Sequence, residues 1–163
     1  MSTTENISYG TSTAITCTLA SLASSSSAGR SCAAIDNTSN KYIDVLLTIA
    51  VKTSSSAMGA DKGGYIWIYG SEDGSNYNGS SSEGEGTDAA VTLDSPSNLR
   101  GPVFLSTPAS STTYKAVISI AQFFGGVMPR KWGFVYQNNN NQNLDSTEGN
   151  HQKTYTGITE TFG

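Results

Sequence analysis

The sequence predicts an all-β protein, an antiparallel β-sandwich that is jelly-roll-like and has about eight strands. Charged residues make up only 13% of the chain, about half of the usual ~25%, and Ser, Thr, Asn and Gly take their place. Several short segments alternate between apolar and polar residues, which is the period of a half-buried strand. Turn signals recur about every ten to fifteen residues, and no segment has the pattern of an amphipathic helix.

The length of 163 residues suits one domain that can bury its own core. Residues 1–12 are polar, and we expect them to form a flexible N-terminal arm. Residues 13–163 are expected to form a single β-sandwich domain. No internal repeat of fixed period is visible, which argues against a propeller or a solenoid.

The first half of the domain contains four predicted strands. In chain order these are residues 14–22, 32–35, 41–53 and 64–74. The third is the strongest, because every second residue is aliphatic: Ile43, Val45, Leu47, Ile49 and Val51. A helix is the alternative for this segment, but the strict alternation favours a strand whose aliphatic face meets a core. The Ser-rich segment 21–31 between the first two strands is expected to be a loop.

The second half contains five predicted segments of strand. They are residues 89–96, 98–108, 112–124, 131–138 and 151–163. Pro102 places the second of them at a sheet edge or a bulge, because proline cannot donate a ladder hydrogen bond. Trp132, Phe134 and Tyr136 are expected on one face of the fourth.

The connection between two of these strands, AQFFGGVMPRKW, is a candidate contact site. We expect one strand to run to Phe124 and the next to begin at Lys131, with two glycines permitting the reversal. Val127 and Met128 would then lie at the tip, beside Arg130 and Lys131. An exposed apolar pair is unfavourable unless another chain covers it, so these four residues predict a contact with a partner subunit. The alternative is that both apolar residues fold back onto the end of their own domain.

The residues that carry catalysis are nearly absent. The single histidine, His151, lies among polar residues and is expected to be exposed and inert. A serine triad would need it, and a zinc site would need more His or Cys than the chain has. We therefore predict no catalytic residues, no metal, no cofactor and no enzymatic activity.

The acidic loop 71–88 offers candidate carboxylates for a sugar-cleaving pair. Glu72 would act with Glu83, Glu85 or Asp88. The same loop has the oxygen ligands for calcium, but it lacks the EF-hand spacing. Solvated loop acids are the interpretation that we favour.

The aromatic residues Trp67, Tyr69 and Tyr77 are of the kind that stack on sugars, and they give an alternative, glycan-contacting site. Core and cross-strand packing is the favoured interpretation for them.

Charge and hydropathy exclude several partners. The net charge is −4 and the cations are scattered, so we expect no nucleic-acid partner. No apolar run reaches the ~20 residues of a membrane helix, and the N-terminus lacks the pattern of a signal peptide. For Cys17 and Cys32, two buried free thiols are favoured over one disulfide.

Three segments carry a resemblance to a known class: GGYIWIYGSEDGSNYNG, NLRGPVFLSTP and AQFFGGVMPRKWGFVYQNNNNQNL. With them the chain resembles the virion structural proteins of tailed bacteriophages. The resemblance implies a capsid decoration (cement) protein, made in the host cytoplasm, that ends in the virion. Its implied partners are the major capsid protein or other virion proteins, and a homo-oligomer, with a trimer favoured. The alternative is a tail or baseplate β-domain that binds host-surface glycan.

Overall fold

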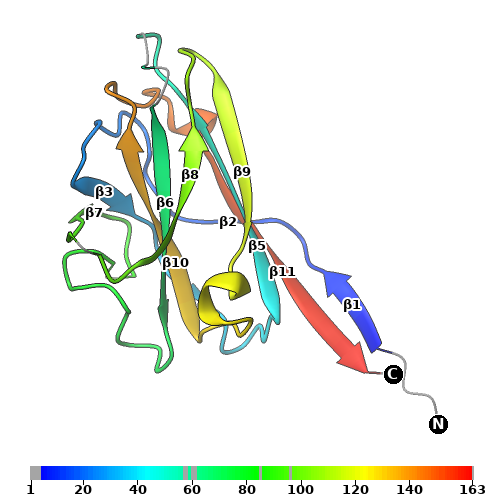
Figure 1. Cartoon of the computed structure of the whole chain (residues 1–163). Coiled ribbons are helices and arrows are strands. Elements are labelled where there is room, and N and C mark those ends of the chain that lie inside the picture. Colours follow the sequence, from blue (N-terminus) through cyan, green and yellow to red (C-terminus); the bar gives the residue numbers. More distant parts are fainter. Residues whose placement is uncertain (1–4, 57–58, 60–61, 85, 96, 163) are drawn as a thin grey trace.

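The alternating segment 41–53 forms strand β5 (Asp44–Lys52), which lies inside one of two antiparallel sheets (Figure 1). This computed structural model describes residues 5–56, 59, 62–84, 86–95 and 97–162. The sheet with β5, here sheet A, has the strand order β1-β11-β5-β9, and β2 pairs with β11. Its other strands are β1 (Glu5–Tyr9), β2 (Thr13–Ala14), β9 (Thr113–Ser119) and β11 (Gln152–Phe162).

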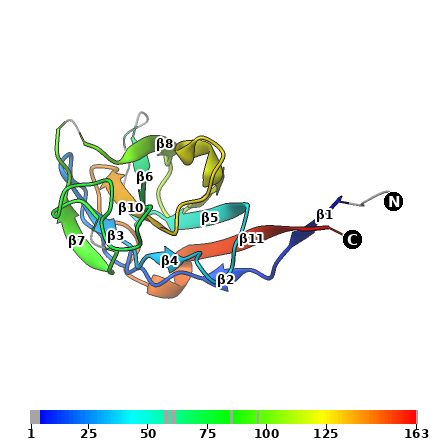
Figure 2. The ribbon, with the colours of Figure 1, turned by 90° about the horizontal axis from the view of Figure 1, so that it is seen from below.

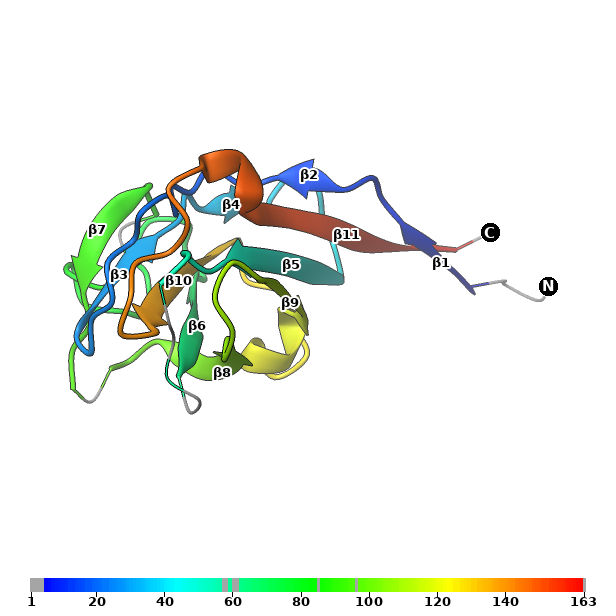
Figure 3. The same cartoon turned by 90° about the horizontal axis from the view of Figure 1, so that it is seen from above.

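Sheet B contains the remaining strands, in the order β7-β3-β10-β6-β8, with β4 paired to β10. Their bounds are β3 (Ala28–Ser31), β4 (Ile35–Asp36), β6 (Gly63–Ser71), β7 (Ala89–Thr92), β8 (Arg100–Ser106) and β10 (Lys131–Asn139). Two short 3-10 helices complete the described elements: η1 (Ala121–Phe124) and η2 (Glu148–Asn150). All strand pairs are antiparallel, and Figure 3 shows the two sheets as separate layers. The predicted antiparallel β-sandwich is therefore confirmed.

The core lies between the two sheets and is built by the predicted alternation. Val45, Leu47, Ile49 and Val51 of β5 are fully buried, and across the core β10 contributes Trp132, Phe134 and Tyr136, which are also fully buried. Ile43 is the exception. It precedes β5 and is 41% exposed, so its predicted place in the core was wrong.

The strand boundaries differ from the predictions in several places. The described residues contain eleven strands rather than about eight. Strand β3 lies inside the segment predicted as a Ser-rich loop. The strand predicted over 112–124 ends at Ser119, and η1 follows it. Strand β8 lies at the edge of sheet B, with a register irregularity between Ile66 and Ile68 of its partner β6, as Pro102 predicted.

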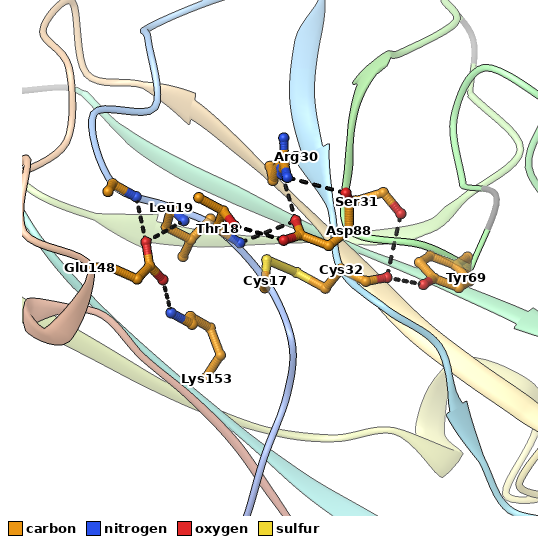
Figure 4. The surroundings of a disulfide bond; sticks show 11 residues. Cys17, Thr18, Leu19, Arg30, Ser31, Cys32, Tyr69, Asp88, Glu148 and Lys153 are labelled. Atoms are coloured by element: carbon orange, nitrogen blue, oxygen red, sulfur yellow. Dashed lines mark hydrogen bonds and ion pairs between the residues drawn. A yellow bond between two sulfur atoms is a disulfide. The ribbon is translucent and has the colours of Figure 1, made fainter.

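The segment 15–20 has the burial pattern of a strand without its ladder. Ile15, Cys17 and Leu19 are buried and the residues between them are not. Its main-chain N–H groups donate to distant carboxylates: Asp88 accepts from Thr18 at 3.1 Å, and Glu148 accepts from Leu19 at 2.8 Å. Figure 4 shows both carboxylates flanking this segment. Side chains thus replace the neighbouring strand that would otherwise satisfy these amides.

The two cysteines of the chain are bonded. Cys17 and Cys32 form a disulfide between the extended segment and the residue that follows β3 (Figure 4). The favoured prediction of two free thiols was wrong, and the alternative of one disulfide is correct. The spacing of fifteen residues did not reveal it, because the pairing arises from the topology that places the extended segment beside residues 32–33, where Ala33 N–H donates to Thr16 O at 2.9 Å.

The two ends of the chain form a ribbon that leaves the body of the sandwich. Strand β1 pairs with the last residues of β11, from Tyr9 opposite Ile158 to Glu5 opposite Phe162. All three views show this two-stranded ribbon extending beyond the two layers (Figures 1, 2 and 3). The predicted loose arm over 1–12 therefore contains an ordered strand at residues 5–9.

Candidate functional site

Two adjoining depressions lie where η1 and the loop after β6 come together. The larger has a volume of about 340 Å³ and is lined by Gly70, Glu72, Asp73, Asn76, Tyr77, Asn78, Arg100, Phe124 and Pro129. The smaller, of about 230 Å³, is lined by Glu72, Phe124, Val127, Met128, Pro129 and Arg130. Because they share Glu72, Phe124 and Pro129, they form one continuous surface, which we call the loop-end surface.

The floor of the loop-end surface depends on the absence of a side chain at Gly70. A Cβ atom there would lie 2.6 Å from Phe124 Cζ and 3.0 Å from Pro129 Cγ. The aromatic ring can therefore pack directly over strand β6. Gly125, with φ of 69°, ends η1 in the left-handed region and turns the chain toward Val127.

The loop after β6 is held by its own polar side chains. Asp73 accepts hydrogen bonds from the main-chain N–H groups of Ser75 and Asn76, each at 2.8 Å. These bonds and those from the side chains of Asn76 and Ser71 lower the pKa of Asp73 well below its ordinary value. Asn78 bridges β6 to the segment before β8, because it accepts from Gly70 N–H and donates to Asn98 O, both at 2.7 Å. The loop is thus ordered by hydrogen bonds.

Tyr77 is the aromatic side chain that this loop presents. Its ring packs edge-to-face on Tyr69, with the centroids 5.2 Å apart and the planes at 86°. Desolvation by this packing raises the pKa of the Tyr77 hydroxyl, and the Asp36 charge adds to the effect. The ring is half-buried and lines the larger depression.

The structure divides the four residues predicted to contact a partner. Val127 is 71% exposed, whereas Met128 is half-buried and packs against the main core. The alternative of folding back onto the domain therefore holds for Met128, whereas Val127 has the exposure that a partner contact would require. Arg130 is exposed and lines the smaller depression, but Lys131 lies in β10 opposite Asp36, and its charge helps to lower the pKa of that aspartate after the hydrogen bonds from Thr38.

The three aromatic residues proposed for glycan contact do not share a surface. Tyr69 is fully buried, which agrees with the packing role favoured for it. Trp67 is half-buried, and its indole N–H donates to Gln137 Oε1 at 3.1 Å. It lines a separate depression of about 410 Å³ with Leu93 and Pro102. Only Tyr77 of the three reaches the loop-end surface.

The loop acids are not all solvated, contrary to the favoured prediction. Glu83 is fully buried and accepts the main-chain N–H groups of Ser80 at 3.1 Å and Asp94 at 2.9 Å. Burial raises its pKa, but these hydrogen bonds and others outweigh that effect, so the pKa lies below the ordinary value. Asp88 is held by Arg30 and Thr18, while Glu72 is exposed. Glu85 lies outside the described residues.

The prediction that His151 is exposed was wrong, since it is 5% exposed. Its Nδ1 accepts the Lys52 N–H at 3.3 Å, and its Nε2 lies 3.0 Å from Asp145 O. The imidazole therefore connects the residue before β11 to the last residue of β5 and to the main chain at Asp145. Among the described residues, no three His, Cys, Asp or Glu side chains are grouped so that they could hold a metal ion.

The terminal ribbon is a second candidate contact region, and sequence reasoning missed it. Ile7 and Tyr9 are 61% and 64% exposed. Their alternation in ENISY was visible, but the composition of the first twelve residues favoured a loose arm. Residues that pair directly share a face of the sheet, so Ile7 and Tyr9 lie on the same face as their partners Glu160 and Ile158.

The two candidate regions, the loop-end surface and the ribbon, both carry exposed apolar side chains beside charged ones. No protein-family profile, curated protein or solved structure matches the chain. Within the described ranges, no helix has the length and apolar character that crossing a membrane requires.

Proposed function

We propose that the protein is a virion structural protein, a capsid decoration (cement) protein that binds and stabilises the major capsid lattice. The observation that carries the proposal is the terminal ribbon, with Ile7 and Tyr9 exposed on an extension that leaves the body. A two-stranded ribbon alone is marginally stable in water. Exposed apolar side chains on such an extension are favourable when another protein surface covers them.

The rest of the chain supports the same role. The sandwich body is cross-linked by one disulfide and has a large, fully buried core. Such a body can hold two contact regions at a fixed separation, the ribbon and the loop-end surface with Val127 and Arg130. A protein that contacts neighbouring capsid subunits at both regions would stabilise the assembled shell by mass action, because it binds the shell and not the dispersed subunits.

The proposal is tested on phage heads with and without the protein. We expect heads that lack it to lose their DNA or break at a lower temperature, and added protein to restore the original temperature. The variant Ile7→Asp/Tyr9→Asp should bind heads more weakly. Ser26→Asp should bind normally, because this exposed residue follows Ser25, which is bonded to Asn138 near the end of β10 that lies away from Arg130. Heads of unchanged stability without the protein would contradict the proposal.

The larger depression of the loop-end surface supports a second candidate, a tail or baseplate β-domain that binds host-surface glycan. It combines one aromatic ring, Tyr77, with Arg100 and the amide of Asn76 in about 340 Å³, a combination that fits ring stacking and polar recognition of a sugar. Binding to a glycan array that Tyr77→Ala abolishes and Trp67→Ala leaves intact would favour this function over the first. Absence of binding across a broad array would exclude it.

A further inference from the structure

The outer face of sheet A carries exposed and half-buried side chains outside the two core clusters, although Ala50 in its middle strand is only 6% exposed. Because Leu47 and Ile49 point into the core, the alternate residues of β5, Leu46 and Thr48, point outward. Cross-strand pairing places Val117 and Thr154 beside Thr48 on this face. Val117 is 58% exposed, and neither Leu46 nor Val117 packs against the core clusters.

This outer face continues onto the ribbon. Along β11, the outward residues after Thr154 are Thr156, Ile158 and Glu160. Ile158 pairs with Tyr9 and Glu160 pairs with Ile7, so both exposed apolar residues of the ribbon belong to the same face. From Val117 to Ile7, the face therefore consists mainly of apolar and threonine side chains.

The charges on this face lie at its two ends. Lys115, next to Val117 in β9, is exposed, and no ion pair of the described residues includes it. At the ribbon end are Glu5 and Glu160, which also have no cationic partner within the described part of the chain. A hydrogen bond shared with Glu5, together with the repulsion between the two carboxyls, raises the pKa of Glu160. Among the described residues, these carboxyls thus lack a nearby cation.

The other charged groups of the face already have partners. Asp44, near its middle, accepts hydrogen bonds from Ser119 Oγ at 2.7 Å and Ala121 N–H at 2.9 Å. Lys52, near the lysine end, forms an ion pair with Asp145 at 3.6 Å. Within the described part of this face, the unpaired charges are therefore one cation at one end and two carboxyls at the other. Eight residues of β11, about 27 Å, separate the level of Lys115 from Glu160.

We propose that the outer face of sheet A binds the same face of a second copy of this chain, in a two-fold arrangement. A surface with opposite charges at its ends is complementary to itself when one copy is reversed, and a two-fold axis provides that reversal. Lys115 of each copy then meets Glu5 and Glu160 of the other, while Val117, Thr48, Ile158 and Tyr9 cover one another between these contacts. The apolar face of the ribbon becomes buried, and the carboxyls gain a cation that the described residues of one chain do not give them.

This inference rests on the proposed function and revises one part of it: the apolar face of the ribbon is assigned to a second copy, so the capsid would be contacted by the dimer, through the loop-end surface and the parts of the ribbon that the dimer leaves exposed. It also replaces the trimer that the resemblance implied with a two-fold dimer as the unit of self-association. The experiment uses the isolated full-length chain, so that its outcome is independent of capsid binding. A dimer that fails to bind heads would overturn the function and leave this inference intact.

The test is sedimentation velocity over a series of concentrations. We expect a species of twice the chain mass of 17.1 kDa. Val117→Asp should remove this dimer, whereas Val127→Asp, at the most exposed apolar residue of the loop-end surface, should leave it unchanged. Far-UV circular dichroism and the melting temperature check that both variants fold. A monomer at all concentrations, a trimer, or a dimer that Val117→Asp does not weaken would each overturn the proposal.

A charge exchange tests the orientation of the two copies. Lys115→Glu and Glu160→Lys should each weaken the dimer about tenfold, because each contact occurs twice in a two-fold dimer. The double variant should recover most of the affinity, since the opposite charges meet again with their signs exchanged. If the loss of binding free energy in the double variant equals the sum of the losses in the two single variants, the two ends do not meet and the two-fold arrangement is wrong.

Discussion

Glu148 accepts the main-chain N–H of Leu19, 129 residues earlier in the chain, at 2.8 Å. The same carboxylate oxygen accepts the N–H of Ala20 at 2.7 Å, and the other oxygen pairs with Lys153. One side chain thus satisfies two amides of the extended segment and neutralises a lysine that is 9% exposed. The stability of the sandwich should therefore depend on this single acid.

Removing Glu148 is expected to destabilise the fold. Glu148→Ala leaves two amides and a buried ammonium without their partner, which should lower the free energy of unfolding by about 2–4 kcal/mol. Glu148→Gln should cost less, because its amide oxygen still accepts from the segment. Urea denaturation gives both values. Glu72→Ala, at an exposed acid of the loop-end surface, is the control and should change little; equal effects of the two alanine variants would refute this role.

Acid should destabilise the protein by protonating Glu148 and Asp88, the two carboxylates that accept hydrogen bonds from the extended segment. Burial raises the pKa values of Glu148 and Asp88, but the hydrogen bonds that they accept outweigh it, so both pKa values lie below the ordinary 4.5 and 3.8. Acids with a lowered pKa in the folded state stabilise it above their unfolded pKa, and this stabilisation is lost as the pH falls through the folded pKa. The melting temperature should therefore decline below about pH 4.5, as thermal melts from pH 7 to pH 2 would reveal. The variant Glu148→Gln/Asp88→Asn should start lower and show a shallower decline.

The disulfide should stabilise the folded protein by an amount that increases with the logarithm of the length of the loop that it closes. Cys17 and Cys32 are fifteen residues apart, and a loop of this length corresponds to about 3 kcal/mol. Reduction of the native protein should lower the free energy of unfolding by that amount, and Cys17→Ala/Cys32→Ala should be as unstable as the reduced protein. Thiol titration of the unfolded, unreduced chain should find no free thiol, and two thiols there would contradict the bond.

The close packing of Phe124 on Gly70 predicts that three glycine-to-alanine substitutions will differ in their effect on stability. Gly70→Ala should displace Phe124 and cost about 1–3 kcal/mol, because the added methyl group overlaps the aromatic ring. Gly125→Ala meets nothing within 4 Å, so its cost of about 1 kcal/mol should come from the left-handed backbone alone. Gly149→Ala has open space and no positive φ, and it should be nearly neutral. Thermal melts would compare the stability of the three variants. The NMR chemical shifts of the Phe124 ring should change only in Gly70→Ala.

The two-residue period predicted most of the fold because burial in a sandwich follows it directly. Leu47 and Ile49 are buried as predicted, since they lie in a strand that is covered on one face by the other sheet. The same period misplaced the strand at 14–22. The alternation of Ile15 and Cys17 reports burial, whereas strand assignment depends on where the amides donate, and here they donate to acids far away in the sequence.

The candidate sites were harder to predict, because they depend on which segments the topology brings together. Val127 is as exposed as its turn suggested. Tyr77 and Arg100, however, line one depression where Asn78 joins the loop after β6 to the segment before β8, an arrangement that depends on the topology. The ribbon could not be predicted for the same reason: nothing in residues 5–9 indicates that their partners lie about 150 residues away in sequence, at 158–162.

The pairing of Glu5 with Phe162 determines how the ribbon would respond to force. If these two residues were pulled apart, the load would fall on one hydrogen-bonded rung at a time, and the ribbon would peel open from its tip. If both were pulled together, the load would run along β11 into the body, where residues 152–158 are hydrogen-bonded to β5, and many rungs would resist at once. The ribbon therefore resists little force when its two strand ends are pulled apart, and much more force when both ends are pulled together along β11.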